Sequence, residues 1–102
     1  MIKQQNNRRL LVLDDENDVA ATICMMAEIA GYQTEHTDNI EVFIEQLLVW
    51  SPTHVVVDLQ LAKIDGIEVI HRLVELDCKA AVIVISGLGG RILDSASRAA
   101  AE

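Results

Sequence analysis

Short runs of aliphatic residues that each end in a polar residue constrain the fold of this 102-residue chain most strongly. There are three such runs: Leu10–Leu13 before Asp14-Asp15-Glu16, Val55–Val57 before Asp58, and Val82–Ile85 before Ser86. Runs of this kind are typical of strands that are buried on both faces of a parallel sheet. Ligands of open α/β sheets bind beyond the carboxyl ends of the strands. The sequence therefore predicts one site that gathers carboxylates and a hydroxyl from distant parts of the chain.

Segments with helical periodicity separate the predicted strands. We expect strands at about 9–14, 32–37, 54–59 and 80–86, and helices at about 17–30, 40–49, 67–76 and from Arg91 onward. The spacing predicts that the first helix is capped by Asn17 or Asp18 and buries one apolar stripe, made of Val19, Ile23, Met26, Ala27 and Ala30. The polar segment 32–37 suits an edge strand. This alternation predicts an α/β fold with right-handed crossovers.

Composition and length limit the classes of function. A net charge of −8 argues against nucleic-acid binding by this segment, which needs a basic surface. The chain has no apolar stretch long enough to span a membrane and no signal peptide, so we expect a cytoplasmic protein. Cys24 and Cys78 lack metal-ligand spacing and indicate reduced thiols. We expect one domain over residues 1–102, with residues 1–8 as a flexible leader.

The predicted site contains three carboxylates that need a cation. Asp14, Asp15 and Asp58 follow neighbouring strands, and carboxylates that lie close together raise each other's pKa unless a cation intervenes. Mg²⁺ binds oxygen ligands, needs few carboxylates and keeps positions for water and phosphate oxygens. A carboxylate held beside Mg²⁺ can attack phosphorus and form an aspartyl-phosphate. The hydroxyl of Ser86 is placed to hydrogen-bond a phosphoryl oxygen.

The order and spacing of these motifs resemble the receiver domain of bacterial two-component response regulators. The resemblance extends from Leu10 to about Arg98 and rests on Asp14-Asp15-Glu16, Gly31-Tyr32, Pro52, Asp58-Leu59-Gln60-Leu61 with Asp65-Gly66, and Ile85-Ser86-Gly87. It implies a doubly wound, flavodoxin-like parallel sheet with the strand order 2-1-3-4-5. It also implies a phosphoprotein that accepts and autohydrolyses a phosphoryl group and is not a conventional enzyme.

The resemblance assigns a role to each site residue. Asp58 corresponds to the phosphoacceptor, which receives a phosphoryl group from a sensor histidine kinase or a phosphotransfer protein. Asp15 and Asp58 correspond to direct Mg²⁺ ligands, Asp14 to a ligand that acts through a metal-bound water, and the backbone carbonyl of Gln60 to a further ligand. Ser86 corresponds to the switch hydroxyl. The phosphorylated domain is expected to control an output domain beyond residue 102, with no membrane contact.

The sequence departs from the family pattern in two places. Ala62 stands where the family commonly has proline, and no fifth apolar run brings a lysine to the site. The lysines of the chain are Lys3, Lys63 and Lys79. We therefore expect a truncated receiver without the fifth strand and fifth helix, in which Mg²⁺ binding survives better than phosphorylation. The fourth strand then becomes an unprotected apolar edge, which favours self-association.

Other functions remain open from the sequence. Gly87-Leu88-Gly89-Gly90 suggests a nucleotide-binding, Rossmann-like module, although the third glycine of that fingerprint would fall at Ile92. A dehalogenase-type phosphatase would need an Asp-x-Asp motif, whereas Leu59-Gln60 follow Asp58. A receiver-like interaction domain that has lost phosphorylation is a third possibility. The segment 86–91 with its alanine-rich continuation resembles receivers fused to cyclic-di-GMP phosphodiesterase domains, and a DNA-binding output domain is the alternative.

Overall fold

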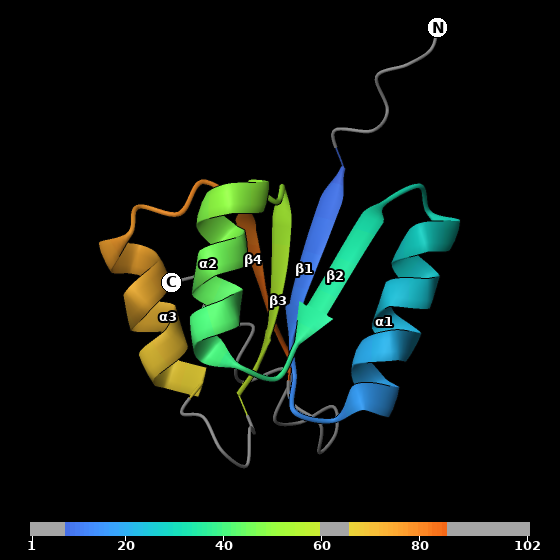
Figure 1. Ribbon diagram of the computed structural model, residues 1–102, viewed down its shortest axis with the longest axis horizontal. Helices are drawn as coiled ribbons and strands as arrows, with labels where there is room; N and C mark the ends of the chain where they lie inside the picture. Colours follow the sequence, from blue (N-terminus) through green and yellow to red (C-terminus); the bar gives the residue numbers. More distant parts are fainter. Residues whose placement is uncertain (1–7, 60–65, 86–102) are drawn as a thin grey trace, which may run out of the picture.

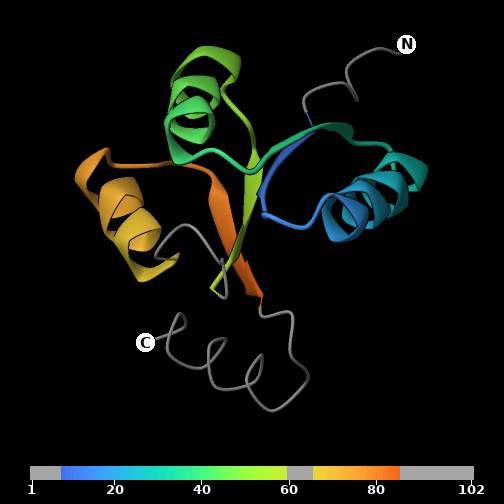
Figure 2. The same ribbon diagram turned by 60° about the horizontal axis from the view of Figure 1, so that its bottom comes forward.

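The computed structural model describes residues 8–59 and 66–85, which form a parallel sheet with the strand order β2-β1-β3-β4 (Figure 1). The elements are β1 (Arg9–Leu13), α1 (Asn17–Ile29), β2 (Gln33–Thr37), α2 (Ile40–Trp50), β3 (His54–Asp58), α3 (Gly66–Glu75) and β4 (Ala81–Ile85). Helix α1 covers one face of the sheet, and α2 and α3 cover the other face (Figure 2). The predicted α/β class and the order of the first four strands are confirmed. The predicted glycine loop at 87–90 and the helix from Arg91 lie outside the described residues.

The core consists of two aliphatic layers, one on each face of the sheet. Alternate residues of a strand point to opposite faces, so β1 and β3 contribute to both layers. The layer beneath α2 and α3 contains Leu11, Leu13, Phe43, Ile44, Val55, Val57, Val69 and Leu73. The layer beneath α1 contains Leu10, Val12, Ala20, Cys24 and Val56. Burial on both faces fixes β1 and β3 at the centre of the sheet and holds their carboxyl ends in place. Within the described part of the chain, no helix is long and apolar enough to cross a membrane.

Helix α1 buries only part of the predicted stripe. Ile23 and Ala27 of that stripe are partly buried and pack against the core layer beneath the helix. Its buried residues are Ala20 and Cys24, whereas Met26 is 60% exposed and Ala30 is also exposed. The small side chains of Ala20 and Cys24 let the helix lie close to β1 and β2, which turns Met26 toward the uncovered part of the sheet. The predicted caps are also wrong, because Glu16 occupies the N-cap position and its side chain makes no capping hydrogen bond.

The two edge strands of the described sheet differ in polarity. Strand β2 contains only polar residues (Gln33, Thr34, Glu35, His36 and Thr37), as expected for an edge. Strand β4 contains only aliphatic residues (Ala81, Val82, Ile83, Val84 and Ile85). Val82 and Ile83 are 39% and 44% exposed. The expected apolar edge at the fourth strand is therefore present in the described structure.

Gly66 lets the start of α3 lie against the backbone of Asp58 and Leu59. It is the first residue of α3 and is buried against the end of β3. A Cβ atom at Gly66 would lie 2.7 Å from the Cα atom of Leu59 and 3.0 Å from the carbonyl oxygen of Asp58. Both neighbours are backbone atoms, so a side chain there must displace the segment that carries Asp58.

We predict that Gly66→Ala destabilises the fold, since overpacking against backbone typically costs about 1–3 kcal/mol. Ile67→Ala is the matched control, because Ile67 is the next residue of α3 and is 53% exposed. The free energy of unfolding of both variants is measured in urea. Equal stability of the two variants would contradict the close approach at Gly66.

Candidate functional site

Two acidic residues lie side by side at the carboxyl ends of the central strands. Strands β1 and β3 are parallel neighbours with Leu13 paired to Val57, so the next residues along both strands are Asp14 and Asp58. Asp14 is 0% exposed and Asp58 is 4% exposed, whereas Asp15 is only partly buried. The structure therefore brings Asp14 and Asp58 together at the predicted edge of the sheet.

Backbone hydrogen bonds hold Asp14 in place, but they involve only one of its two carboxylate oxygens. Its Oδ1 atom accepts a hydrogen bond of 2.9 Å from the backbone N–H of Glu16. Its own N–H donates to the carbonyl oxygen of Thr37 at 3.1 Å. The Oδ2 atom is buried and has no hydrogen-bond partner in the described structure. A buried oxygen without a partner costs about 1–3 kcal/mol, so such an atom indicates a place where a cation or a water binds.

The electrostatic surroundings of Asp14 disfavour its charged form. Burial is the largest cause that raises the pKa of Asp14 above its ordinary value of 3.8. The negative charges of Asp58, Asp15 and Glu16 raise this pKa further, and the N–H of Glu16 opposes them in part. Four carboxylates thus act on one small region, and a cation bound there would relieve their mutual repulsion.

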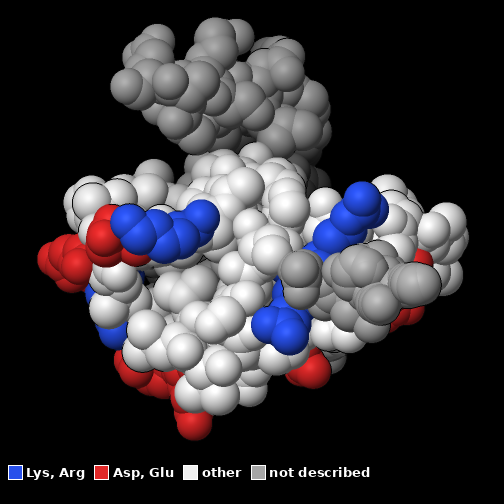
Figure 3. Space-filling view, turned by 90° about the horizontal axis from the view of Figure 1, so that it is seen from above, with Lys and Arg blue, Asp and Glu red and all other residues white. Residues whose placement is uncertain are grey.

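The described lysine and arginine residues all lie at the opposite end of the sheet. Arg8 and Arg9 are at the start of β1, Arg72 is in the last turn of α3, and Lys79 precedes β4. Figure 3 shows this amino-terminal end, where blue side chains are visible on both sides. Residues 8–59 and 66–85 therefore place no basic side chain among the acids at the carboxyl ends. A positive charge near these acids must therefore come from a bound ion or from a group outside the described residues.

The donor set at the carboxyl ends fits a hard divalent ion that keeps most of its waters. No group of three or more His, Cys, Asp or Glu side chains in the described residues could hold a metal by itself. Mg²⁺ does not need such a group, since it binds through one or two carboxylates and completes its coordination shell with water and phosphate oxygens. The free Oδ2 atom of Asp14 beside Asp58 meets that requirement. Gln60 and Ser86, the other predicted site residues, lie outside the described residues.

Two contributions to the site were missed by the sequence analysis. The backbone N–H of Glu16 orients Asp14, and the missing side chain of Gly66 makes room for the backbone of Asp58. An aspartate hydrogen-bonds its own backbone two residues on in a common turn, so the spacing of Asp14 and Glu16 carried the first signal. The Asp65-Gly66 pair was used there only as part of the family pattern, with no role for Gly66 in positioning Asp58.

Comparisons with known proteins agree on one family. Residues 10–100 match the family model of the response regulator receiver domain, a match that includes the glycine loop 87–90. The chain is 30% identical over 84 residues to the photosynthetic apparatus regulatory protein RegA of Rhodobacter capsulatus. The aligned segment covers 82% of this chain and 46% of RegA. The chain is 29% identical over 92 residues to the response regulator receiver protein CpdR of Brucella abortus, over 90% of this chain and 77% of CpdR. The chain thus spans about half of the length of RegA.

A solved structure shows the same fold. The response regulator TrrA of Thermotoga maritima, in complex with Mg²⁺ and BeF, has a TM-score of 0.72 and 22% identity, over 80% of this chain and 71% of that chain. TrrA has also been solved in complex with the histidine kinase ThkA, with the same TM-score and identity over 81% of this chain. The match over residues 10–100 favours a receiver over a nucleotide-binding module built on residues 87–90.

We predict that Asp14→Asn stabilises the chain at neutral pH in the absence of divalent ions. Because the folded-state pKa of Asp14 is raised, its contribution to stability is fully present below 3.8 and is lost as the pH rises through the folded-state value. Asparagine keeps the oxygen that accepts from Glu16 but removes the charge, which should gain about 1 kcal/mol at pH 7. The gain should shrink toward zero in acid.

Urea unfolding of wild type and Asp14→Asn between about pH 3 and pH 7, with a chelator present, measures this difference. Asp38→Asn is the control, since Asp38 is an exposed aspartate outside the site. A variant that is less stable than wild type at pH 7 would show that the charge of Asp14 is already compensated by the protein.

Proposed function

The chain belongs to the response regulator receiver domain family, and we propose that it is a phosphoacceptor domain in which Asp58 takes a phosphoryl group with the help of Mg²⁺. The observation that carries this proposal is the buried pair Asp14 and Asp58, in which one oxygen of Asp14 has no hydrogen-bond partner among the described residues. In the proposed step, a carboxylate oxygen of Asp58 forms a bond to phosphorus while the P–N bond of a phosphohistidine breaks. The histidine nitrogen leaves as the phosphoryl group is transferred.

The proposed metal ligands are oxygen atoms at the carboxyl ends of β1 and β3. Asp15 and Asp58 would hold Mg²⁺ directly, Asp14 would act through a bound water, and the carbonyl of Gln60 would complete the protein ligands. Bound Mg²⁺ would offset the negative charge of the acids and of the incoming phosphoryl group. The complex of TrrA with Mg²⁺ and BeF supports Mg²⁺ as the ion, because TrrA has the same fold.

The hydrogen-bonded backbone at Asp58 and Leu59 suits a nucleophile that must be presented in one orientation. Asp58 is the last residue of β3, and the N–H of Leu59 donates to the carbonyl oxygen of Ile85 at 2.9 Å. This hydrogen bond ties the segment after Asp58 to β4. We infer that Ser86, the residue after Ile85, supplies the switch hydroxyl, so that its movement toward the phosphoryl group would reposition the segment after β4.

We propose a histidine kinase or a phosphotransfer protein as the phosphodonor. The complex of TrrA with the histidine kinase ThkA supports this proposal, because TrrA has the same fold. An output domain is part of the same proposal. RegA is about twice as long as the segment that matches this chain, so a regulator of this family can carry further sequence. A cyclic-di-GMP phosphodiesterase output stays a prediction from the sequence, as does a cytoplasmic location.

We predict that a small phosphodonor such as acetyl phosphate labels the chain at Asp58 only in part and only with Mg²⁺, because Mg²⁺ binding is expected to survive better than phosphorylation. Intact-mass spectrometry should show a species with one added phosphoryl group, which is absent from Asp58→Asn and after chelation. Asp38→Asn is the control for the loss of an exposed carboxylate. Labelling of Asp58→Asn at the wild-type level would refute the assignment of the acceptor.

We also predict that Mg²⁺ alone stabilises the folded chain, whether or not phosphorylation occurs. Binding to the folded state adds about 2.7 kcal/mol at a ligand concentration 100 times the Kd. Asp15→Asn and Asp58→Asn should weaken the Mg²⁺-dependent rise in the unfolding midpoint, and Asp38→Asn should not. If Mg²⁺ stabilises all four proteins equally, the ion binds elsewhere.

A further inference from the structure

We propose that Thr37 is a positioning residue of the acidic site, which holds the backbone of Asp14 in the orientation that the site requires. Thr37 is the last residue of β2, and Asp14 follows β1, the neighbouring strand. The inference rests on the proposed Mg²⁺-dependent phosphoacceptor site and adds a residue that is not among its proposed ligands. Thr37 acts through Asp14 rather than by contact with the ion or the phosphoryl group.

A backbone hydrogen bond joins the carboxyl ends of β1 and β2. Thr37 is paired with Leu13 in the parallel ladder of these two strands. Directly after that pair, the N–H of Asp14 donates to the carbonyl oxygen of Thr37 at 3.1 Å. Because the peptide group between Leu13 and Asp14 is planar, this bond fixes the whole unit, to which the Cα atom of Asp14 belongs.

The side chain of Thr37 sets the direction of its own carbonyl group. Its Oγ1 atom accepts a hydrogen bond of 3.1 Å from the N–H of Asn39, two residues further along the chain. A turn of this kind restricts rotation about the Cα–C bond of the threonine. The carbonyl oxygen of Thr37 moves with that rotation, so the turn keeps it directed at the N–H of Asp14.

Asn39 connects this turn to helix α2 and, through the helix, to the core. Its Oδ1 atom accepts from the N–H of Val42 at 3.0 Å, and its carbonyl oxygen accepts from the N–H of Phe43 at 2.9 Å. Phe43 is 0% exposed and belongs to the core layer beneath α2 and α3. The N–H group that Thr37 binds therefore comes from a residue whose position is fixed by the core.

Asp14 forms a turn of the same type at the end of β1, so two such turns are joined by one backbone bond. Its Oδ1 atom accepts from the N–H of Glu16, also two residues further along, at 2.9 Å. Because Oδ1 is held in this way, the backbone of Asp14 also determines where the buried Oδ2 atom lies, which has no hydrogen-bond partner among the described residues. Metal-binding and catalytic groups must be held to within about 0.5 Å of their working positions. A tilt of the Asp14 backbone would therefore weaken the proposed site.

Amide hydrogen exchange of the metal-free chain, followed by NMR, tests whether Thr37 holds Asp14. Thr37→Val removes the hydroxyl and keeps the shape of the side chain. We expect the N–H of Asp14 to exchange at least about fivefold faster in this variant, in line with the loss of one hydrogen bond. Thr37→Ser keeps the hydroxyl and should restore the wild-type rate. Thr34→Val is the matched control, because it removes another hydroxyl of β2, which donates to Glu28 at 2.6 Å, and it should leave exchange at Asp14 unchanged.

Mg²⁺ titrations of the same proteins, followed by NMR, test whether this hold on Asp14 serves the site. The Kd for Mg²⁺ should be about three- to tenfold weaker in Thr37→Val, which is at or below the loss for a residue that contacts a metal ligand with its side chain. It should stay within about twofold of the wild-type value in Thr37→Ser and Thr34→Val. Asn39→Ala separates positioning from stability, because it removes the cap of α2 but keeps the N–H that Thr37 binds. It should lower the urea midpoint and leave the Kd for Mg²⁺ unchanged.

The outcomes distinguish this inference from the proposed function. Wild-type exchange at Asp14 in Thr37→Val would overturn the inference, and so would an equal loss of Mg²⁺ affinity in Thr37→Val and Asn39→Ala. A wild-type chain that binds no Mg²⁺ would instead refute the proposed metal site. The exchange rates would still show whether Thr37 holds Asp14, because that measurement needs no metal.

Discussion

The parallel pairing of β1 with β3 is the constraint on which the rest of the structure depends. Both strands are buried on two faces, and their register places Asp14 beside Asp58 at one edge. The aliphatic side chains fix where the acids must lie, although the acids would be better solvated apart. The fold thus holds two carboxylates close together at a cost, and the raised pKa of Asp14 expresses that cost.

The sequence was sufficient for those parts of the structure that depend on strong local patterns. The aliphatic runs before Asp14 and Asp58 gave the strands to within a residue or two, and parallel topology then implied that the acids meet. Periodicity was right for α1 only in part. Ile23 and Ala27 do pack against the core, but Met26 is exposed and Ala20 is buried, because close packing against β1 and β2 favours the smaller side chain. The anchoring of Asp14 by the N–H of Glu16 is a backbone contact, which side-chain patterns do not report.

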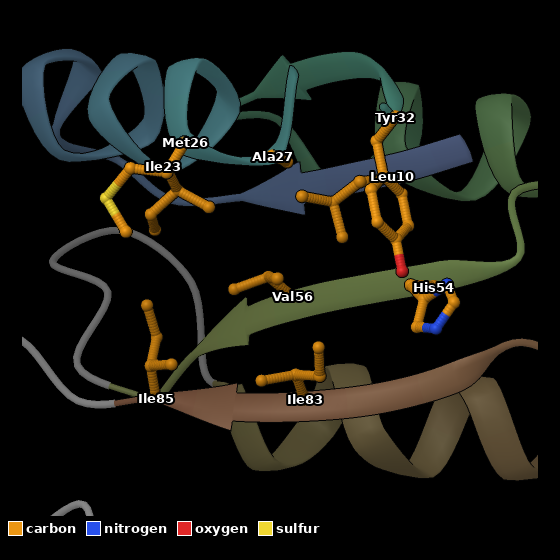
Figure 4. A pocket seen from close by; sticks show the side chains of 9 residues that line it. All are labelled: Leu10, Ile23, Met26, Ala27, Tyr32, His54, Val56, Ile83 and Ile85. Atoms are coloured by element: carbon orange, nitrogen blue, oxygen red, sulfur yellow. The ribbon is translucent and has the colours of Figure 1, made fainter. Parts of the chain in front are cut away.

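An apolar hollow of about 380 Å³ beside α1 is lined by Leu10, Met26, Val56, Ile83 and Ile85 (Figure 4). This hollow and the apolar edge at β4 have one cause. Helix α1 packs over β1 and β2, so the α1 face of β3 and β4 has no described helix above it. Side chains that point to this face, such as Ile83 and Ile85, are only partly covered. On the other face α3 packs against β3, and Val84 is 9% exposed there. Among the described residues, the two faces of β3 and β4 are therefore covered unevenly.

The distribution of charge explains why the proposed phosphoacceptor site needs an ion. Asp14, Asp15, Glu16 and Asp58 act on one another at the carboxyl ends of β1 and β3, where the described residues supply no basic side chain. Lys79 lies at the opposite end of the sheet and is paired there with Asp77 at 3.1 Å. A divalent ion would offset the negative charge from within the site, and it would do so again for the charge that a phosphoryl group adds.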